Sequence, residues 1–422
     1  MTKLGVLFSV LGVGAGCIPA FAQKQLPNII VMLSDDQGWG DLGFTGNTFV
    51  QTPNIDRIAH EGTILENFYV CPVSSPTRAE FLTGRYHVRS CVNSTTGGGE
   101  RFNLGEKTIA EYFREAGYAT SLFGKWHSGT QYPYHPNARG FEEFYGFCSG
   151  HWGNYWNPVL EHNGEIISGE GFIIDDLTDK ALDYIRDHKE HPFFMFLSYN
   201  TPHSPMQVPD SWWNRVKDRT LSQRATFPEQ EDTTFTKAAL ALAENLDWNI
   251  GRVLSLLHSL DLEQETIVIY FSDNGPNSFR WNGGMKGRKG STDEGGVRSP
   301  FCIRWPGHIR KGAVETQLSG AIDLIPTLLG LAGIEYTPLR KLDGIDWGQR
   351  LLDEKAPAID RVLYSYWGGK TSVRISYYLL DAEDHLYKTD IDRAQRKDVS
   401  DKEPEIYELS LIHISEPTRL RR

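Results

Sequence analysis

The chain of 422 residues carries 43 Lys and Arg against 54 Asp and Glu, which gives a formal net charge of −11 at pH 7. This acidic balance, with no basic stripe, argues against a nucleic-acid partner. The length suits one large α/β domain and a smaller lobe, and beyond the N-terminus no apolar run is long enough to form a stable membrane span.

The N-terminus predicts export. Residues 1–22 combine a charged start at Lys3 with an apolar core and end in Ala-Phe-Ala, which is the pattern of a secretory signal peptide. We expect cleavage after Ala22 rather than a lipid anchor at Cys17, because the residues before Cys17 fit a lipoprotein signal poorly. Export permits disulfides. The spacing does not distinguish the three possible pairings of the four remaining cysteines, which are Cys71, Cys91, Cys148 and Cys302.

Two apolar segments far apart in the sequence end in matching polar pairs. The runs at 28–36 and 266–274 each predict a short buried strand that ends in two oxygen-bearing side chains. Ligands of open parallel sheets lie beyond the carboxyl ends of the strands, so both pairs are expected in one crevice. Three carboxylates and one amide favour Ca²⁺ or Mg²⁺ over Zn²⁺. The predicted metal ligands are Asp35, Asp36, Asp273 and Asn274.

The segment at 74–85 reads Ser-Ser-Pro-Thr-Arg-Ala-Glu-Phe-Leu-Thr-Gly-Arg. Pro76 suits the first turn of a helix, which would leave Ser74 just before a helix N-terminus, where free amides favour an anion. Arg78 follows about one turn later and can donate two hydrogen bonds to an oxyanion. The simpler alternative is an ordinary capped helix, because Ser-Ser-Pro-Thr is a common N-cap sequence.

Strands and helices alternate along the chain, with helices expected at 107–116, 176–188 and 236–260. This alternation predicts an α/β fold with a large, mainly parallel sheet and helices on both faces.

The segment at 74–85 resembles the signature of the formylglycine-dependent sulfatases, a family with the alkaline phosphatase-like fold. The resemblance extends from Asn28 to about Glu408. It implies that Ser74 is oxidised to a formylglycine, whose hydrate attacks the sulfur of a sulfate ester. It also implies one calcium ion, held by the modified Ser74 and by Asp35, Asp36, Asp273 and Asn274. Cys71 lies nearby but fits no register of the signature, and we interpret it as structural.

Four other basic residues match the family's order along the chain. Lys125 and His127 lie in Gly-Lys-Trp-His, His203 follows a strand-like segment, and Lys289 begins a Gly-rich stretch. The resemblance implies that Arg78, Lys125 and Lys289 contact the sulfate. It implies that His127 promotes sulfate release and that His203 protonates the departing alcohol. A lone histidine or lysine would more often be a solvated or structural residue.

A serine at the nucleophile position resembles the bacterial sulfatases that a radical S-adenosylmethionine enzyme, a serine-type maturase, modifies before export. This resemblance implies a periplasmic enzyme. We expect an exo-acting hydrolase of sulfated carbohydrates, with stacking and polar contacts to the sugar from His151, Trp152, Asn154, Arg280 and Trp281. Loop packing by the tryptophans is an equally good interpretation. Two alternatives are a phosphatase or phosphonate monoester hydrolase of the same superfamily and a catalytically silent glycan-binding relative.

The expected division is a signal peptide at 1–22, a catalytic domain at 23–345 and a small C-terminal subdomain at 346–408. The last of these would contain strands at 362–366, 372–380 and 406–409 and would resemble the family's small antiparallel sheet with a helix. Residues 409–422 resemble a translated sequencing adapter, so we expect the native C-terminal subdomain to be truncated there.

Overall fold

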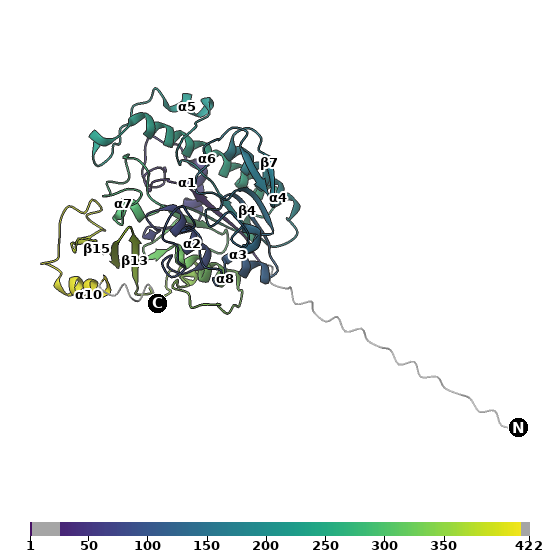
Figure 1. Cartoon of the computed structure of the whole chain (residues 1–422). Helices are drawn as coiled ribbons and strands as arrows, with labels where there is room; N and C mark the ends of the chain where they lie inside the picture. Colours follow the sequence, from purple (N-terminus) through teal and green to yellow (C-terminus); the bar gives the residue numbers. More distant parts are fainter. Residues whose placement is uncertain (2–25, 415–422) are drawn as a thin grey trace.

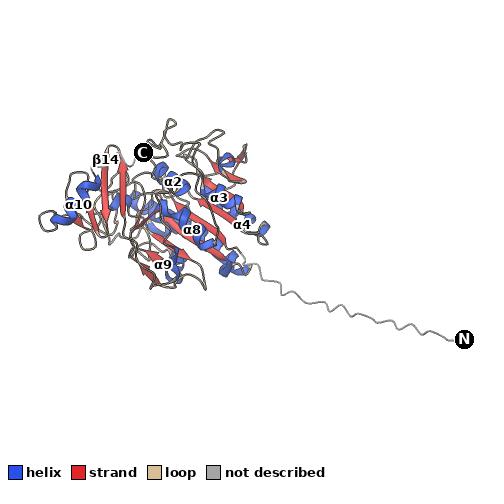
Figure 2. Ribbon diagram, turned by 90° about the horizontal axis from the view of Figure 1, so that it is seen from below, coloured by secondary structure: helices blue, strands red, loops and turns tan. Residues whose placement is uncertain are grey.

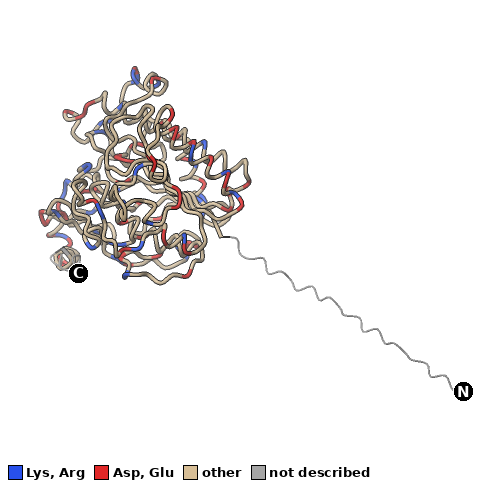
Figure 3. Tube along the Cα trace, turned by 45° about the vertical axis from the view of Figure 1, so that its right-hand side comes forward, with Lys and Arg blue, Asp and Glu red and all other residues tan. Residues whose placement is uncertain are grey.

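The computed structural model describes residue 1 and residues 26–414. Residues 2–22 of the predicted signal peptide, Cys17 among them, and the last eight residues therefore lie outside the described residues. Figure 1 shows a large α/β body with a smaller lobe at one side that carries β13, β15 and α10. Figure 3 shows positively and negatively charged residues interspersed along the fold.

A ten-stranded sheet forms the centre of the large body. Its central strands are parallel, and the antiparallel pairs involve β10 and the hairpin of β6 and β7 at one edge. The strands lie in the order β11 (Ala313–Glu315), β2 (Thr63–Leu65), β10 (Phe301–Arg304), β9 (Thr266–Ser272), β1 (Asn28–Ser34), β8 (Phe193–Ser198), β4 (Ala119–Lys125), β5 (Glu143–Phe147), β6 (Val159–His162) and β7 (Glu165–Ser168).

Strand β1 shows why helices cover both faces of this sheet. Successive side chains of a strand point to opposite faces, and every residue of β1 is buried. Ile29, Val31 and Leu33 belong to one hydrophobic core, shared with α2, α3 and α8. Ile30 and Met32 belong to a second core, shared with α1, α4 and α6. The predicted mainly parallel α/β sheet with helices on both faces is confirmed.

The described residues contain ten α-helices and four short 3₁₀ helices. The α-helices are α1 (Pro53–Glu61), α2 (Ser74–Thr83), α3 (Ile109–Glu115), α4 (Ile173–Asp187), α5 (Asp210–Val216), α6 (Thr233–Ser259), α7 (Glu294–Val297), α8 (Leu324–Ala332), α9 (Gly348–Leu352) and α10 (Pro404–Ile414). The 3₁₀ helices are Pro136–Arg139, Pro228–Gln230, Glu263–Glu265 and Ala321–Asp323.

The smaller lobe contains a four-stranded antiparallel sheet, which Figure 2 shows beside α10. Its strands are β13 (Val362–Trp367), β14 (Lys370–Ile375), β15 (Tyr378–Leu380) and β16 (Leu386–Lys388). A two-stranded sheet of β3 (Phe68–Tyr69) and β12 (Ser319–Gly320) completes the strands. The predicted small antiparallel sheet with a helix is confirmed.

The prediction of a strand at 406–409 is wrong, because these residues lie in α10. This helix packs against β14 and β15. Pro404 and Glu405 precede them, and proline and an acidic residue in a first turn both favour a helix N-terminus. The short apolar run alone did not distinguish a strand from a helix.

Candidate active site

The adjacent parallel strands β1 and β9 place the two predicted polar pairs side by side. Their registers match to the last residue, with Ser34 opposite Ser272. Beyond these ends, the backbone N–H of Asp36 donates to Asp273 Oδ1 at 3.1 Å, and Asn274 Nδ2 donates to Asp36 Oδ1 at 2.8 Å. Asp36 has φ = 64°, a left-handed conformation that is uncommon for a non-glycine residue. The four predicted metal ligands thus form one buried group.

Three oxygens of this group lack a hydrogen-bond partner among the described residues, although each is buried: Asp35 Oδ1, Asp36 Oδ2 and Asn274 Oδ1. Buried oxygens are normally hydrogen-bonded, so each unpaired atom calls for a ligand. Two carboxylate oxygens and one amide oxygen are hard donors, the type that Ca²⁺ and Mg²⁺ prefer. The residues present therefore fit a hard divalent cation.

Ser74 is the first residue of α2, whereas the sequence predicted it just before the helix, a difference of one position. Its side chain is buried. Its Oγ lies 2.9 Å from Arg78 Nε and 3.2 Å from His127 Nδ1. Helix α2 ends at Thr83 because Gly84 follows with φ = 66°, and the Gly84 N–H donates to Glu80 O. The sequence Ser-x-Pro-x-Arg thus places a hydroxyl and a guanidinium on one helical face, four residues apart.

The Arg78 guanidinium joins the nucleophile helix to the metal-ligand group. Besides Ser74, it contacts Asp273 Oδ2 at 3.1 Å, the carbonyl of Lys125 at 3.0 Å and the hydroxyl of Ser198. Its side chain is fully buried. Four contacts from different elements fix the orientation of this cation, so it offers a positive charge at a defined position beside Ser74.

Two lysines face the first polar pair. Lys125 Nζ lies 2.7 Å from Asp35 Oδ2, and Lys289 Nζ lies 2.6 Å from Asp36 Oδ1. Burial lowers the pKa of Lys125 more than the Asp35 carboxylate raises it. Burial also acts to lower the pKa of Lys289, but Asp36 and Asp35 outweigh it and raise that pKa.

The two histidines lie in different surroundings. His127 has φ = 60°, and its Nε2 lies 2.9 Å from Thr95 O. Burial and then the Lys125 charge lower the pKa of His127 well below its usual value, so the ring is neutral. His203 is more accessible, with Nδ1 at 2.7 Å from Ser204 O and Nε2 at 3.5 Å from Asp36 Oδ2.

The residues predicted to contact a sugar differ in their exposure and in their contacts within the protein. The His151 ring is 5.2 Å from the His203 ring and exposed, so it lies at the mouth of the site. Trp152 stacks on Phe147 at 5.1 Å, which supports the loop-packing alternative for this residue. Asn154 is exposed and Trp281 is partly buried.

Arg280, by contrast, is buried. Its guanidinium pairs with Asp41 at 2.6 Å and donates to the backbone carbonyl of Asp36 at 2.9 Å. These contacts occupy it within the protein, so its geometry suits positioning of Asp36 rather than contact with a sugar. The sequence alone did not reveal this partner, because Asp41 and Arg280 are 239 positions apart.

The structure also adds three positioning residues that the sequence analysis did not single out. Thr77 Oγ1 donates to the carbonyl of Asp273 at 2.6 Å and accepts from the N–H of Cys71 at 2.8 Å. Ser198 contacts Arg78, and Asp41 holds Arg280. Only Thr77 had a possible signal in the sequence, since it lies within the 74–85 segment.

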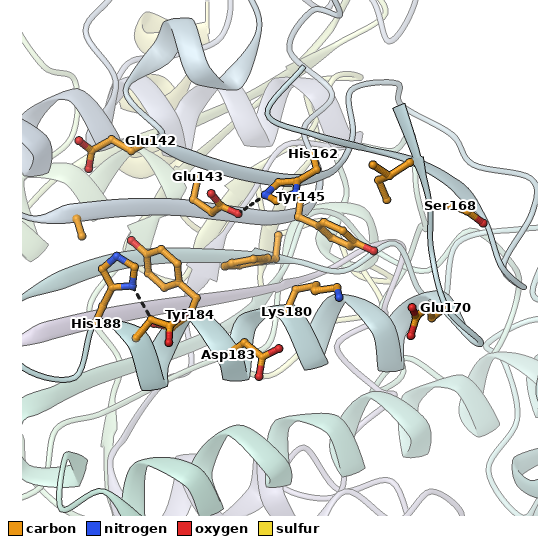
Figure 4. Close-up of a pocket in the computed structure, with 14 residues that line it drawn as sticks. Glu142, Glu143, Tyr145, His162, Ser168, Glu170, Lys180, Asp183, Tyr184 and His188 are labelled. Atoms are coloured by element: carbon orange, nitrogen blue, oxygen red, sulfur yellow. Dashed lines mark hydrogen bonds and ion pairs between the residues drawn. The ribbon is translucent and has the colours of Figure 1, made fainter. Parts of the chain in front are cut away.

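A separate cavity of about 520 Å³ lies near the opposite end of β4 and β5 (Figure 4). Its lining includes Glu142 and Glu143 and is rich in carboxylates, and Lys180 is its only lysine. An anionic ester would meet electrostatic repulsion there. The basic residues around Ser74 favour an anion instead.

The cysteines Cys71, Cys91, Cys148 and Cys302 are free, so none of the three possible pairings is present. Within residues 26–414 no helix combines the length and the hydropathy that a membrane crossing requires.

Residues 27–334 match the family model described as "Sulfatase", and residues 289–408 match "N-sulphoglucosamine sulphohydrolase, C-terminal". The chain is 32% identical over 392 residues to N-acetylgalactosamine-6-sulfatase of Homo sapiens, with 85% of this chain and 70% of that protein covered. It is 30% identical to the uncharacterized sulfatase YdeN of Escherichia coli (strain K12), with 82% and 70% covered.

Solved structures are similar over nearly the whole chain. The crystal structure of Ps i-CgsB in complex with k-i-k-neocarrahexaose superimposes with a TM-score of 0.84 and 29% identity, covering 94% of each chain. Phosphonate monoester hydrolase of Agrobacterium radiobacter shares the fold, with a TM-score of 0.69 and 18% identity over 94% of this chain and 95% of that chain. The chain therefore belongs to the sulfatase family and is a sulfuric ester hydrolase.

Proposed function

We propose that this protein removes sulfate from carbohydrate monoesters, acting at the ends of glycans, with a formylglycine made from Ser74 as the nucleophile. The observation that carries the proposal is the position of Ser74 Oγ, held by Arg78 and His127. The same Arg78 contacts Asp273 of the metal-ligand group. Ser74, the Arg78 guanidinium and the metal ligand Asp273 thus belong to one hydrogen-bonded network.

The cation of this proposal is one Ca²⁺, held by Asp35, Asp36, Asp273, Asn274 and the modified residue 74. Its support is the three buried oxygens that have no hydrogen-bond partner among the described residues. When bound, such an ion stabilises negative charge that develops on the reacting oxygens. Lys125 and Lys289 pair with Asp35 and Asp36 in this structure. Because these carboxylates would bind the ion instead, both ammonium groups would be free to turn towards a sulfate.

A formylglycine at position 74 would supply an aldehyde hydrate, a stronger nucleophile than a serine hydroxyl. The protein side chains then divide the remaining work. Arg78, Lys125 and Lys289 bind the sulfate oxygens and stabilise their charge. His203 delivers a proton to the leaving alcohol, which suits its accessible position. His127 Nδ1 faces Ser74 Oγ and, because the ring is neutral, accepts a proton there as sulfate leaves.

A sugar substrate is supported by the relatives. One is named N-acetylgalactosamine-6-sulfatase, and the complex with k-i-k-neocarrahexaose contains a carbohydrate. We propose that His151, Asn154 and Trp281 contact the sugar at the mouth of the site. Trp152 would contribute through its edge, because its face packs on Phe147, and Arg280 would act by holding Asp36.

The organisation of the chain follows from the same proposal. We infer a catalytic domain at 23–345, supported by the family match at 27–334. The C-terminal subdomain at 346–408 is supported by the four-stranded sheet. A serine-type radical S-adenosylmethionine maturase would modify Ser74, and a signal peptide at 1–22 would direct the enzyme to the periplasm.

The test is mass spectrometry of the peptide containing Ser74, from protein coexpressed with such a maturase, together with sulfate release from N-acetylgalactosamine 6-sulfate. We expect a loss of two hydrogens at Ser74 that correlates with calcium-dependent release. Ser74→Ala should abolish turnover, while Ser75→Ala, which loses a bond to Ser94 O, is the matched control. Modified protein that releases phosphate but no sulfate would support the phosphonate hydrolase alternative. Modified protein that retains calcium and a sugar without turnover would support the silent glycan-binding alternative.

A further inference from the structure

A second group of potential metal ligands lies outside the catalytic site. His135 directly precedes the 3₁₀ helix Pro136–Arg139, Cys148 directly follows β5, and Glu161 belongs to β6. One ligand atom of each residue lies within 4.8 Å of the others. His135 Nε2 is 2.5 Å from Glu161 Oε1, and Cys148 Sγ is 3.9 Å from Glu161 Oε2.

The backbone brings these three donors together. Strands β5 and β6 are antiparallel, and Gly146 pairs with Glu161, which places Glu161 beside the end of β5. The His135 ring packs edge-on against Phe144 at 5.3 Å. Its Nδ1 faces the backbone N–H of Asn137 at 3.3 Å, so Nε2 is the atom turned towards Glu161. Three different segments thus converge on one point.

Glu161 is the only carboxylate of the three residues, and His135 balances its charge only when the ring is protonated. Among the described residues, the ion pair of Glu161 is with His135, and it has no Lys or Arg partner. A divalent cation bound by a thiolate, a carboxylate and a neutral imidazole would give a site of zero net charge. Charge neutrality matters here because the side chains of His135 and Glu161 are only 12% and 18% exposed. This remaining exposure leaves a path for an ion to enter.

We propose that Cys148 Sγ, His135 Nε2 and a Glu161 carboxylate oxygen form a binding site for Zn²⁺ or a similar borderline divalent cation. A sulfur, a nitrogen and an oxygen donor favour zinc over calcium, which prefers oxygen alone. Binding releases the thiol proton to solvent and breaks the His135–Glu161 hydrogen bond. The imidazole proton moves from Nε2 to Nδ1, and the hydrogen bond that Nδ1 accepts from the Asn137 N–H is given up. A fourth position remains for water.

In a second cluster of the described residues, backbone carbonyls occupy the histidine. Cys71, Glu80 and His87 also lie close together. The His87 ring, however, is bonded on both sides, with Nδ1 at 2.7 Å from Val92 O and Nε2 at 3.1 Å from Tyr366 O. Neither nitrogen offers a lone pair to a metal. In the proposed site both His135 nitrogens are also bonded, but the partner of Nε2 is Glu161, which is itself a proposed ligand.

The proposed ion would stabilise the backbone next to the active-site residue His127. The carbonyl of Cys148 accepts the backbone N–H of His127 at 3.1 Å. A metal that joins Cys148 to His135 and Glu161 would hold this strand end, and through it the His127 backbone, in place. Its function is therefore structural, and it does not require contact with substrate.

The test adds Co²⁺ to the calcium-saturated full chain and records thiolate-to-cobalt charge-transfer absorption. Because this band requires a sulfur ligand, cobalt at the oxygen ligands around Asp36 does not produce it. We expect the band to saturate at one equivalent and to disappear when Zn²⁺ displaces the cobalt. Cys148→Ser should abolish it, whereas Cys91→Ser, at the exposed free cysteine, should retain it.

Two further measurements keep the proposal falsifiable. Glu161→Gln, which leaves the thiol in place, should weaken Zn²⁺ binding by at least about tenfold. Zn²⁺ should raise the melting temperature of the parent protein and leave that of Cys148→Ser unchanged. Retained calcium-dependent sulfate release would show that Cys148→Ser is folded. The absence of a band at one equivalent, or a band that persists in folded Cys148→Ser, would overturn the site.

Discussion

Arg78 Nε lies 2.9 Å from Ser74 Oγ, one helical turn away on α2, while its NH2 group reaches Asp273, the residue that directly follows β9. The Arg78 guanidinium therefore fixes the position of Ser74 relative to Asp273, one of the metal ligands. Lysine has a single charged nitrogen and cannot make these contacts together.

Replacing Arg78 by lysine tests this arrangement. We expect Arg78→Lys to retain Ser74 modification but to lower kcat by roughly 100-fold or more, because an oriented charge that stabilises the transition state is lost. Steady-state kinetics with a sulfated sugar, after mass spectrometry of residue 74, measures the effect. Arg186→Lys, on the exposed side of α4, is the control. Unchanged kcat in Arg78→Lys would contradict this function of the guanidinium.

Gly150 lies directly against the His127 ring, and a methyl group there would overlap Nε2 and the neighbouring ring carbons. Gly150→Ala should displace the ring from Thr95 O and Ser74 Oγ. We expect kcat/KM to fall by about 100-fold, since a displacement of about 1 Å has effects of this size.

The matched control for this substitution is Gly153→Ala, where an added methyl group meets nothing within 4 Å. This variant should keep the parent's kinetics. If both alanine variants were equally active, His127 would not need its observed position.

The buried pair of Asp41 and Arg280 should contribute to stability and to metal binding. Arg280→Met leaves the Asp41 carboxylate buried without its partner, which costs about 3–5 kcal/mol of unfolding free energy. It also removes the donor to the Asp36 carbonyl, so calcium affinity should fall. Urea denaturation and calorimetric titration measure the two effects. Arg186→Met breaks an exposed pair with Asp183 and should cost no more than about 1 kcal/mol.

Glu80 should make the stability of the protein depend on pH. Burial raises the pKa of this carboxyl from 4.5 to about 8 in the folded chain. The folded state therefore keeps a proton that the unfolded state has already released. This contribution to stability is fully present below pH 4.5 and is lost as the pH rises through about 8.

Glu80→Gln removes this titration. We expect the difference in unfolding free energy between about pH 5 and about pH 8 to be smaller in the variant than in the parent. Urea denaturation at both pH values measures it, with Glu190→Gln at an exposed position as the control. Parallel pH profiles for parent and Glu80→Gln would show that this carboxyl is not responsible.

Calcium should stabilise the fold as well as support turnover. Binding to the folded state alone adds about 2.7 kcal/mol when the free ion is 100 times its dissociation constant. We expect chelation to lower the melting temperature and Asp36→Asn to bind calcium at least about tenfold more weakly. Differential scanning calorimetry with and without calcium tests this expectation. An equal melting temperature in both conditions would contradict a calcium site at these residues.

The sequence by itself determined the elements with strong local patterns. The apolar runs of β1 and β9 and the polar pairs after them predicted both the parallel sheet and a shared crevice, because strand ends in such a sheet meet at one edge. The segment at 74–85 predicted a helix with Ser74 at its start, within one residue. These features depend on neighbours in the chain, which a sequence displays directly.

The tertiary structure alone decided how side chains distant in sequence use their polar groups. Arg280 is occupied by Asp41, Trp152 packs on Phe147, and residues 406–409 form a helix against the small sheet. It also decided that His135, Cys148 and Glu161 converge. No local pattern encodes such pairings, because they arise only when the packed elements bring separate segments within contact distance and bury their charges together.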